Sequence, residues 1–168
     1  MRDLKRANAL QPAYRQLEDM GIHAFTPMTW RLITIQGKKV RREVPFVQDL
    51  VFVRECRAVL DPIVARTPTL QYRWLRKTYR EPMTVTDSAM ECFIRAVKSS
   101  ESPRYYLPEE ITPMMLGRRI RIVGGPLDGQ EGTLVTTRGS KVKRLLVELP
   151  NLLAVSVEVS PEYVQLIR

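Results

Sequence analysis

The chain has 168 residues, of which 44% are apolar and 27% are charged. A chain of this length can bury one ordinary core or two small ones, and its net charge of +9 favours a polyanionic partner. No run approaches the roughly 20 apolar residues of a membrane span and the N-terminus lacks an apolar signal region, so we expect a cytoplasmic protein without membrane attachment.

The inventory of reactive side chains excludes the common metal and cofactor sites. Cys56 and Cys92 lie far apart without CxxC spacing, and His23 is the only histidine. No zinc or haem site can be assembled from these residues in one chain, and no nucleophile, base and carboxylate are spaced for catalysis. We therefore expect free thiols, no cofactor and no enzymatic activity.

The first part of the chain passes from a helical to an extended pattern. Apolar residues at helical spacing predict a helix from about Ala9 to Met20, which Gly21 ends. Aromatic and β-branched residues predict strands over Ile22–Ile35 and Val40–Phe46. Because the turn Gln36-Gly37-Lys38 joins them, we expect a hairpin with a basic tip.

The segments that follow complete an α+β pattern. Leu50–Arg54 is an almost continuous apolar run that predicts a buried strand, and Leu70–Leu75 predicts another. Helices are expected over Cys56–Ala65 and over Asp87–Lys98, the second with Thr86 or its own first residue as the cap. This order predicts an antiparallel sheet with helices packed on it, which is an α+β fold.

The composition changes after residue 98. Residues 99–114 are rich in serine and proline and have no periodic apolar face, so they are interpreted as a linker. Five short extended segments separated by glycine or proline follow: Arg119–Val123, Glu131–Thr137, Lys143–Glu148, Leu153–Val159 and Val164–Ile167. Such a series predicts a small closed β-barrel. We therefore expect two separately folded domains, residues 1–98 and residues 115–168.

The segment that opens this series has the most informative spacing. It reads GRRIRIVGGPLDGQEGTL, and its central glycines supply a turn that only glycine enters without strain. The pattern closely resembles the KOW motif, with matches at Gly117, Arg121, Gly125, Pro126, Gly129 and Gly132. That motif opens SH3-like barrels in NusG factors and in certain ribosomal proteins, so the resemblance implies this fold for residues 115–168.

Three further segments resemble the N-terminal (NGN) domain of the NusG family. They are Gly21–Pro27, Val44–Val53 and Glu81–Asp87, in the order that the family has them. Over nearly its whole length the chain is therefore similar to NusG transcription elongation and antitermination factors. Its N-terminal half is most similar to the operon-specific UpxY type, which is associated with capsular polysaccharide gene clusters. The resemblance implies a monomer that binds RNA polymerase and suppresses pausing or termination.

The resemblance also implies a polymerase-binding surface. Phe46, Val47, Leu50 and Phe52 would lie in or near the apolar depression that grips the clamp helices of polymerase. Core packing is the competing interpretation for each of these side chains, because large apolar residues are usually buried.

The densest basic cluster lies at the predicted hairpin tip and consists of Lys38, Lys39, Arg41 and Arg42. These side chains could contact nucleic acid of the transcription complex or an acidic lobe of polymerase. A merely solvated hairpin is an equally good interpretation, because charges also protect edge strands from pairing.

The sequence departs from the family pattern in two loops. Gln48-Asp49 replaces the usual Pro-Gly pair, and the barrel loop that presents an aromatic residue to a ribosomal partner reads Pro150-Asn151-Leu152-Leu153. The resemblance therefore does not extend to contact with a ribosomal protein or with Rho. The alternative function is that of a KOW-containing ribosome-associated or RNA-binding protein, in which the barrel reads RNA.

Overall fold

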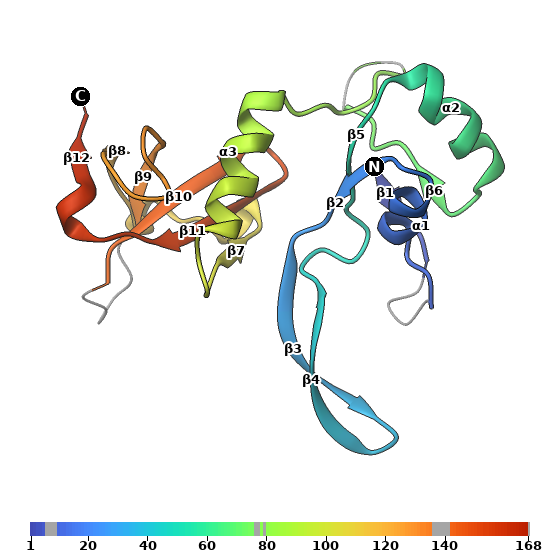
Figure 1. Ribbon diagram of the computed structural model, residues 1–168, viewed down its shortest axis with the longest axis horizontal. Helices are drawn as coiled ribbons and strands as arrows, with labels where there is room; N and C mark the ends of the chain where they lie inside the picture. The colour runs from blue at the N-terminus through green and yellow to red at the C-terminus, as the bar shows by residue number, and fades with distance from the viewer. Residues whose placement is uncertain (6–9, 76–77, 79, 136–141, 168) are drawn as a thin grey trace. The chain divides into compact units, whose positions relative to one another are not determined.

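The computed structural model describes residues 1–5, 10–75, 78, 80–135 and 142–167. Within these residues the chain combines several β-sheets with three α-helices, α1 (Ala13–Asp19), α2 (Arg57–Arg66) and α3 (Asp87–Lys98) (Figure 1). It divides into two compact units, Met1–Thr84 and Val85–Arg168. None of the described helices is long and apolar enough to cross a membrane.

The strands of the N-terminal unit are short and arranged in pairs. They are β1 (Arg2–Asp3), β2 (His23–Phe25), β3 (Met28–Ile35), β4 (Lys38–Pro45), β5 (Phe52–Arg54) and β6 (Leu70–Gln71). β1 pairs with β6, β2 with β5 and β3 with β4, all antiparallel. In the described part of this unit, three two-stranded ladders therefore stand where we expected a single antiparallel sheet.

Two prolines explain why the expected long strands are interrupted. Pro27 separates β2 from β3, and its carbonyl oxygen accepts a hydrogen bond from the backbone N–H of Phe46 over 2.8 Å. Pro45 ends β4, and the following residues form a turn before β5 begins at Phe52. Because proline has no N–H to donate to a ladder, each of these positions ends the pairing on one side.

The first helix is shorter than its sequence pattern predicts. Ala9, where the prediction began, lies outside the described residues, and Leu10 is 99% exposed. α1 begins at Ala13, whose backbone N–H donates to the buried carboxylate of Asp3 over 2.7 Å. Pro12 at the N-cap offers no side-chain acceptor, so Asp3 on β1 satisfies a helix-start N–H that would otherwise lack a partner.

The other two helices are close to their predicted bounds. α2 begins and ends one residue later than expected and contains Pro62. α3 has the predicted bounds, and Thr86 is its cap, because the Thr86 hydroxyl oxygen accepts from the Ala89 N–H over 3.3 Å. In the N-terminal unit, α1, α2 and the ladders share a core: Ala13, Leu17, Ile22, Val51, Leu60 and Leu70.

The C-terminal unit is built on one six-stranded antiparallel sheet. Its strands are β7 (Arg104–Tyr106), β8 (Leu116–Ile122), β9 (Glu131–Val135), β10 (Arg144–Leu149), β11 (Leu153–Glu158) and β12 (Val164–Leu166). They lie in the order β12-β8-β9-β10-β11-β7. The five predicted strands are present with ends shifted by at most three residues, and the predicted end of β9 at residues 136–137 lies outside the described part.

The closed barrel that we expected is not formed by the described residues. β12 and β7 are the outer strands of the sheet, and each pairs on one side only. β7 takes the outer edge of β11, and α3 packs on β10 and β11 with Phe93 and Ala96 fully buried. The sheet therefore completes its core with a helix and an added strand.

The division into units differs from the expected domain boundary. We expected α3 within residues 1–98 and a linker over residues 99–114, whereas both lie in the C-terminal unit. The expected linker contains β7 and two short 3-10 turns, Pro108–Glu110 and Pro113–Met115. Its side chains Tyr106, Ile111 and Met115 pack against the buried residues Val135, Leu146 and Ala154. A helical period reveals that α3 has an apolar face, but it does not reveal which strands that face meets.

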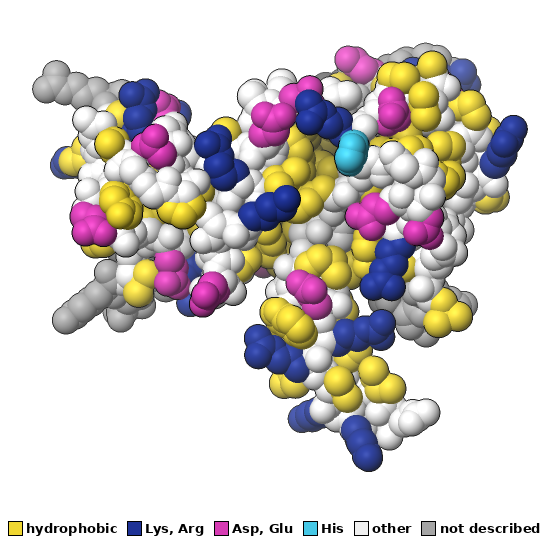
Figure 2. Space-filling model, in the orientation of Figure 1, with side chains coloured by type: hydrophobic (Ala, Val, Ile, Leu, Met, Phe, Trp, Pro, Cys, Tyr) yellow, Lys and Arg dark blue, Asp and Glu magenta, His cyan; other side chains and the backbone are white. Residues whose placement is uncertain are grey.

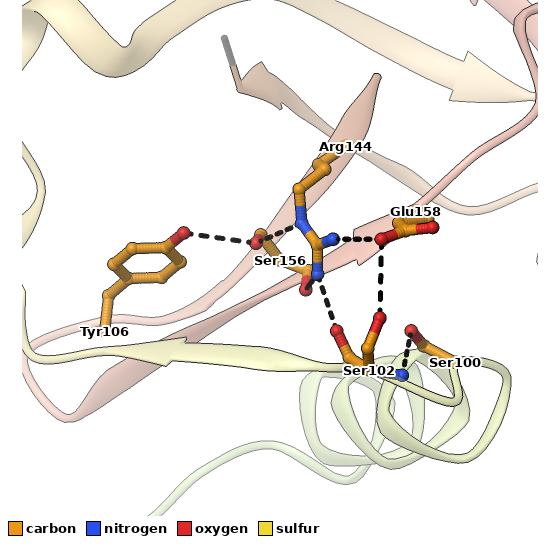
Figure 3. A network of polar contacts seen from close by, with 6 residues as sticks. All are labelled: Ser100, Ser102, Tyr106, Arg144, Ser156 and Glu158. Atoms are coloured by element: carbon orange, nitrogen blue, oxygen red, sulfur yellow. Dashed lines mark hydrogen bonds and ion pairs between the residues drawn. The ribbon is translucent and has the colours of Figure 1, made fainter. Parts of the chain in front are cut away.

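A buried arginine, Arg144, joins the serine-rich segment at Ser102 to the sheet by hydrogen bonds (Figure 3). Arg144 on β10 is 2% exposed, and its Nη1 donates to Glu158 Oε1 over 2.7 Å. Its Nη2 donates to the carbonyl oxygens of Ser102 and Ser156 over 2.8 and 2.7 Å, and its Nε donates to Ser156 Oγ over 2.9 Å. Burial lowers the pKa of Arg144, but a guanidinium remains charged at neutral pH. Its donors are matched by partners, as a buried charge requires.

Candidate interaction surfaces

The apolar residues around the β4–β5 connection divide into a core residue and accessible ones. Leu50 is 3% exposed and belongs to the interior. Phe46, Val47 and Phe52 are half-buried, so part of each side chain faces solvent. Three of the four residues expected at a polymerase contact can therefore be reached by a partner, and Leu50 cannot.

Strand pairing adds one aromatic residue that the sequence did not single out. Phe25 on β2 lies directly opposite Phe52 on β5, and their ring centroids are 6.3 Å apart. Directly opposite residues of an antiparallel pair share one face, and Phe25 is also half-buried. We name Phe25, Phe46, Val47 and Phe52 the apolar surface. Phe25 is assigned to this surface because β2 pairs with β5. A single sequence does not reveal that pairing.

β3 and β4 form a long hairpin that extends away from α1 and α2 of the same unit (Figure 1). Eight residue pairs connect the strands, from Met28 opposite Pro45 to Ile35 opposite Lys38. The two-residue turn has positive φ at Gln36 (48°) and Gly37 (77°), which matches the right-handed twist of a hairpin. Figure 2 shows dark-blue basic and yellow apolar side chains together along this hairpin.

The four predicted basic residues are exposed but do not share one face. Lys39 and Arg41 lie opposite Thr34 and Leu32, whereas Lys38 and Arg42 lie opposite Ile35 and Arg31. Successive residues of a strand point to opposite faces, so each face of the hairpin carries two of the four cations. Arg31 on β3 adds a further cation beside Arg42, and sequence reasoning had not included it.

The hairpin also exposes large apolar side chains. Trp30 is 57% exposed and Leu32 is 72% exposed. The Arg41 guanidinium carbon lies 5.0 Å from the centre of the Trp30 ring, which is a cation–π distance. Exposed apolar side chains next to cations characterise a contact surface for a partner, so the purely solvated interpretation of this hairpin loses support.

The glycine-rich turn of the C-terminal unit has the geometry that its spacing predicts. Gly124, Gly125 and Gly129 have φ values of 100°, 69° and 75°. The Asp128 carboxylate accepts from the Gly124 N–H over 2.6 Å, and the Gly129 N–H donates to the Ile122 carbonyl oxygen over 2.8 Å. Left-handed φ values are the reason that glycine is needed at these positions. Pro126 lies exposed in the same turn.

The other motif residues serve packing and strand pairing. A Cβ at Gly132 would collide with the Leu146 carbonyl oxygen, and a Cβ at Gly117 would lie 2.9 Å from the Leu134 carbonyl oxygen. Arg121 forms an ion pair with Glu131 across the β8–β9 ladder. The six motif residues therefore build the turn and the sheet.

Neither cysteine takes part in a disulfide: Cys56 is exposed and Cys92 is partly buried. In the part of the chain that the structure describes, no group of three or more histidine, cysteine, aspartate or glutamate side chains could hold a metal ion.

Comparison with models of known protein families found no match, and comparison with curated proteins found none either.

Proposed function

We propose that this chain is a NusG-type transcription elongation and antitermination factor, a monomer that binds RNA polymerase in the cytoplasm through its N-terminal unit. The apolar surface is the observation that carries the proposal. It exposes Phe46, Val47 and Phe52 in the segment whose sequence resembles the polymerase-binding strand of the family. Partly exposed aromatic side chains on a protein of net charge +9 favour a specific protein contact.

The C-terminal unit supports the same proposal through its topology. Four consecutive strands, β8 to β11, form a meander, and a 3-10 turn at Pro161–Tyr163 returns the chain so that β12 pairs with β8. A small SH3-like barrel needs this return of its last strand to its first. Together with the glycine turn, this order supports an SH3-like KOW domain that α3 and β7 extend, and the ladders with α1 and α2 then correspond to an NGN-like domain.

The mechanism follows from differential binding. A factor that binds the elongating conformation of polymerase more tightly than the paused conformation shifts the population towards elongation. A ten-fold difference in affinity corresponds to about 1.4 kcal/mol, which the burial of one large apolar side chain can supply. In this scheme the apolar surface provides the contact, and the hairpin cations approach nucleic acid of the complex or an acidic polymerase lobe. Control of a single operon, of the capsular polysaccharide type, is the specialised form that the UpxY resemblance favours.

The alternative function, an RNA-binding or ribosome-associated protein, would rest on the arginines of β8. Arg119 and Arg121 are exposed, but both lie within 4 Å of the Glu131 carboxylate. Tyr163, which precedes β12, is 38% exposed and lies against Gly124, where a Cβ would be 3.2 Å from its ring. A single partly exposed ring is a weaker platform for successive bases of single-stranded RNA than a row of aromatic side chains. Glu131 also offsets part of the charge of Arg119 and Arg121, so the polymerase proposal is preferred.

The test is capture of core RNA polymerase by the immobilised full-length chain. Phe46→Asp combined with Val47→Asp places two charges on the apolar surface and should abolish capture. Val59→Asp is the matched control, because Val59 is 42% exposed at the start of α2, where an acidic residue is tolerated.

Circular dichroism and the melting temperature must show that the double variant is folded, and Val47→Asp alone is the milder substitute if it is not. Capture that persists in a folded variant rules out the apolar surface as the polymerase contact. Recovery of ribosomal subunits without polymerase would favour the alternative function.

A further inference from the structure

The segment that carries Phe46 and Val47 of the apolar surface lies outside the strand ladders. Residues 46–49 follow β4 and form bends and turns. They include neither proline nor glycine, so no residue of this segment restricts the backbone in the way that proline does. Irregular connections are more mobile than the elements that they join. The conformation of this segment therefore depends on hydrogen bonds that other parts of the chain supply.

Three residues from the start of β3 and the connection before it supply such hydrogen bonds. The Pro27 carbonyl oxygen accepts from the Phe46 N–H over 2.8 Å. Arg31 Nη2 donates to the Phe46 carbonyl oxygen over 3.3 Å. The buried hydroxyl of Thr26 donates to the Leu50 carbonyl oxygen over 2.5 Å, just beyond the segment. Both backbone polar groups of Phe46 are therefore engaged by residues at least 15 positions earlier in the chain.

Arg31 combines this contact with a place on the hairpin. It lies on β3 directly opposite Arg42 on β4, and both side chains are exposed. Directly opposite residues of an antiparallel pair share one face, and like charges in such a pair are destabilising. In the described residues Arg31 donates to the Phe46 carbonyl oxygen and Arg42 does not. The bond to Phe46 gives Arg31 a role that its cross-strand neighbour cannot explain.

We propose that Arg31 is a positioning residue for polymerase binding. Its guanidinium holds the peptide group between Phe46 and Val47, so that both side chains keep the orientation in which a partner can reach them. Pro27 fixes the other side of Phe46, and a segment held on both sides loses less conformational entropy on binding. Because the apolar surface is the contact that Arg31 orients, this role rests on the proposed function.

The contacts of Arg31 favour this role over that of one more free cation. A free cation on the hairpin would be available to an anionic partner, as the exposed Arg42 is. The Arg31 guanidinium is instead directed at a backbone carbonyl oxygen of the apolar surface. A hydrogen bond from a charged donor is stronger than one between neutral groups. Loss of Arg31 should therefore affect the apolar surface as well as the charge of the hairpin.

The amide signals of the free protein provide the first measurement. The Val47 N–H belongs to the same peptide group as the Phe46 carbonyl, so its chemical shift reports the bond from Arg31. Arg31→Ala should change this signal and speed up amide exchange at Phe46 and Val47. Arg42→Ala is the matched control, because it removes the same charge from the same face of the hairpin, and it should leave the Val47 signal unchanged. Circular dichroism shows whether both full-length variants are folded.

The affinity for core RNA polymerase provides the second measurement. Arg31→Ala should weaken binding by about 2- to 12-fold more than Arg42→Ala, because one hydrogen bond is lost in addition to the charge. A Phe46→Ala background separates positioning from charge. If Arg31 acts through Phe46, its substitution should have a smaller effect in that background, whereas Arg42→Ala should keep its effect. Arg31→Lys retains a charged donor and should recover part of the affinity.

Two results would overturn the positioning role: equal weakening of polymerase binding by Arg31→Ala and Arg42→Ala, or a Val47 signal that Arg31→Ala leaves unchanged. An undiminished effect of Arg31→Ala in the Phe46→Ala background would also overturn it. Failure of the unsubstituted chain to bind polymerase would contradict the proposed function itself. The Val47 signal is measured without polymerase, so it shows separately whether Arg31 holds the segment.

Discussion

Two strands that are both rich in apolar residues differ in burial: one lies in the core of the C-terminal unit, and the other is exposed in the N-terminal unit. In β11 of the C-terminal unit, Leu153, Val155 and Val157 are at most 1% exposed, whereas in β3 of the N-terminal unit Trp30 and Leu32 are 57% and 72% exposed. Both strands are rich in residues that favour extended structure. The difference lies in their neighbours: β11 is flanked by β10 and β7 and covered by α3, whereas β3 pairs only with β4 in the described residues. β-propensity therefore selects a strand, but neighbouring layers decide whether that strand is core or contact surface.

The largest expected difference in stability is between two truncations, one of a buried ring and one of an exposed side chain. Phe93→Ala should reduce the stability of the C-terminal unit by about 3–5 kcal/mol, because the ring is completely buried and its removal leaves a cavity. Leu32→Ala should change stability by less than about 0.5 kcal/mol, because that side chain is already in water. Urea unfolding followed by circular dichroism measures both. Equal losses in the two variants would contradict the contrast between core and contact surface.

The next effect compares an ion pair whose arginine is buried with an ion pair whose two side chains are both exposed. Arg144→Ala removes a guanidinium with four partner atoms at 2.7–2.9 Å and should cost about 2 kcal/mol. Arg121→Ala removes a pair in which both side chains are more than a third exposed and should cost less than about 1 kcal/mol. Hydrogen exchange supplies the second measurement: the amides of β7 should exchange faster in the Arg144 variant only. Unchanged exchange there would mean that the Arg144 network does not hold β7.

Alanine substitutions at two glycines of the motif distinguish the cost of steric crowding from the cost of backbone strain. Gly132→Ala should cost about 1–3 kcal/mol, because the added Cβ meets the Leu146 backbone and overpacks the sheet. Gly129→Ala should cost about 1 kcal/mol, because its φ of 75° is unfavourable for alanine although nothing lies within 4 Å of the new Cβ. Melting temperatures of the two variants rank them, and a larger loss at Gly129 would contradict the close approach at Gly132.

The smallest expected effect is a pH dependence of the stability of the N-terminal unit. The folded pKa of Tyr72 is raised from 10 to about 12. The neutral phenol is therefore favoured by folding, and its contribution to stability is present below pH 10 and lost as the pH rises towards 12. The absorbance of tyrosinate should include an ionisation near pH 12, and Tyr72→Phe should remove that step. If Tyr72→Phe instead removed a step near pH 10 and left the step near pH 12 in place, Tyr72 would not be the residue whose pKa is raised.

Much of the secondary structure was predictable from local patterns. The bounds of α3, its Thr86 cap and the glycine turn follow from residues close together in sequence, where capping and φ preferences act. The meander strands followed from the same kind of signal, since glycine and proline separate them.

Long-range features were not predictable in this way. The capping of α1 by Asp3 joins residues 10 positions apart, the pairing of Phe25 with Phe52 joins residues 27 positions apart, and Arg144 reaches Ser102 across 42 positions. For the candidate surfaces, the sequence located the cations of the hairpin but not their division between two faces, which depends on the register of β3 and β4. The family resemblance placed Leu50 in or near a contact surface, whereas the apolar run itself predicted a buried strand, and Leu50 is buried.

Hydrogen exchange of the full-length chain with and without core RNA polymerase is the most direct test of the proposed function. We predict protection at residues 25–54, which contain the apolar surface and the hairpin, and little change in β8 to β11. Protection confined to the C-terminal unit, or no protection in any segment at saturating polymerase, would contradict it.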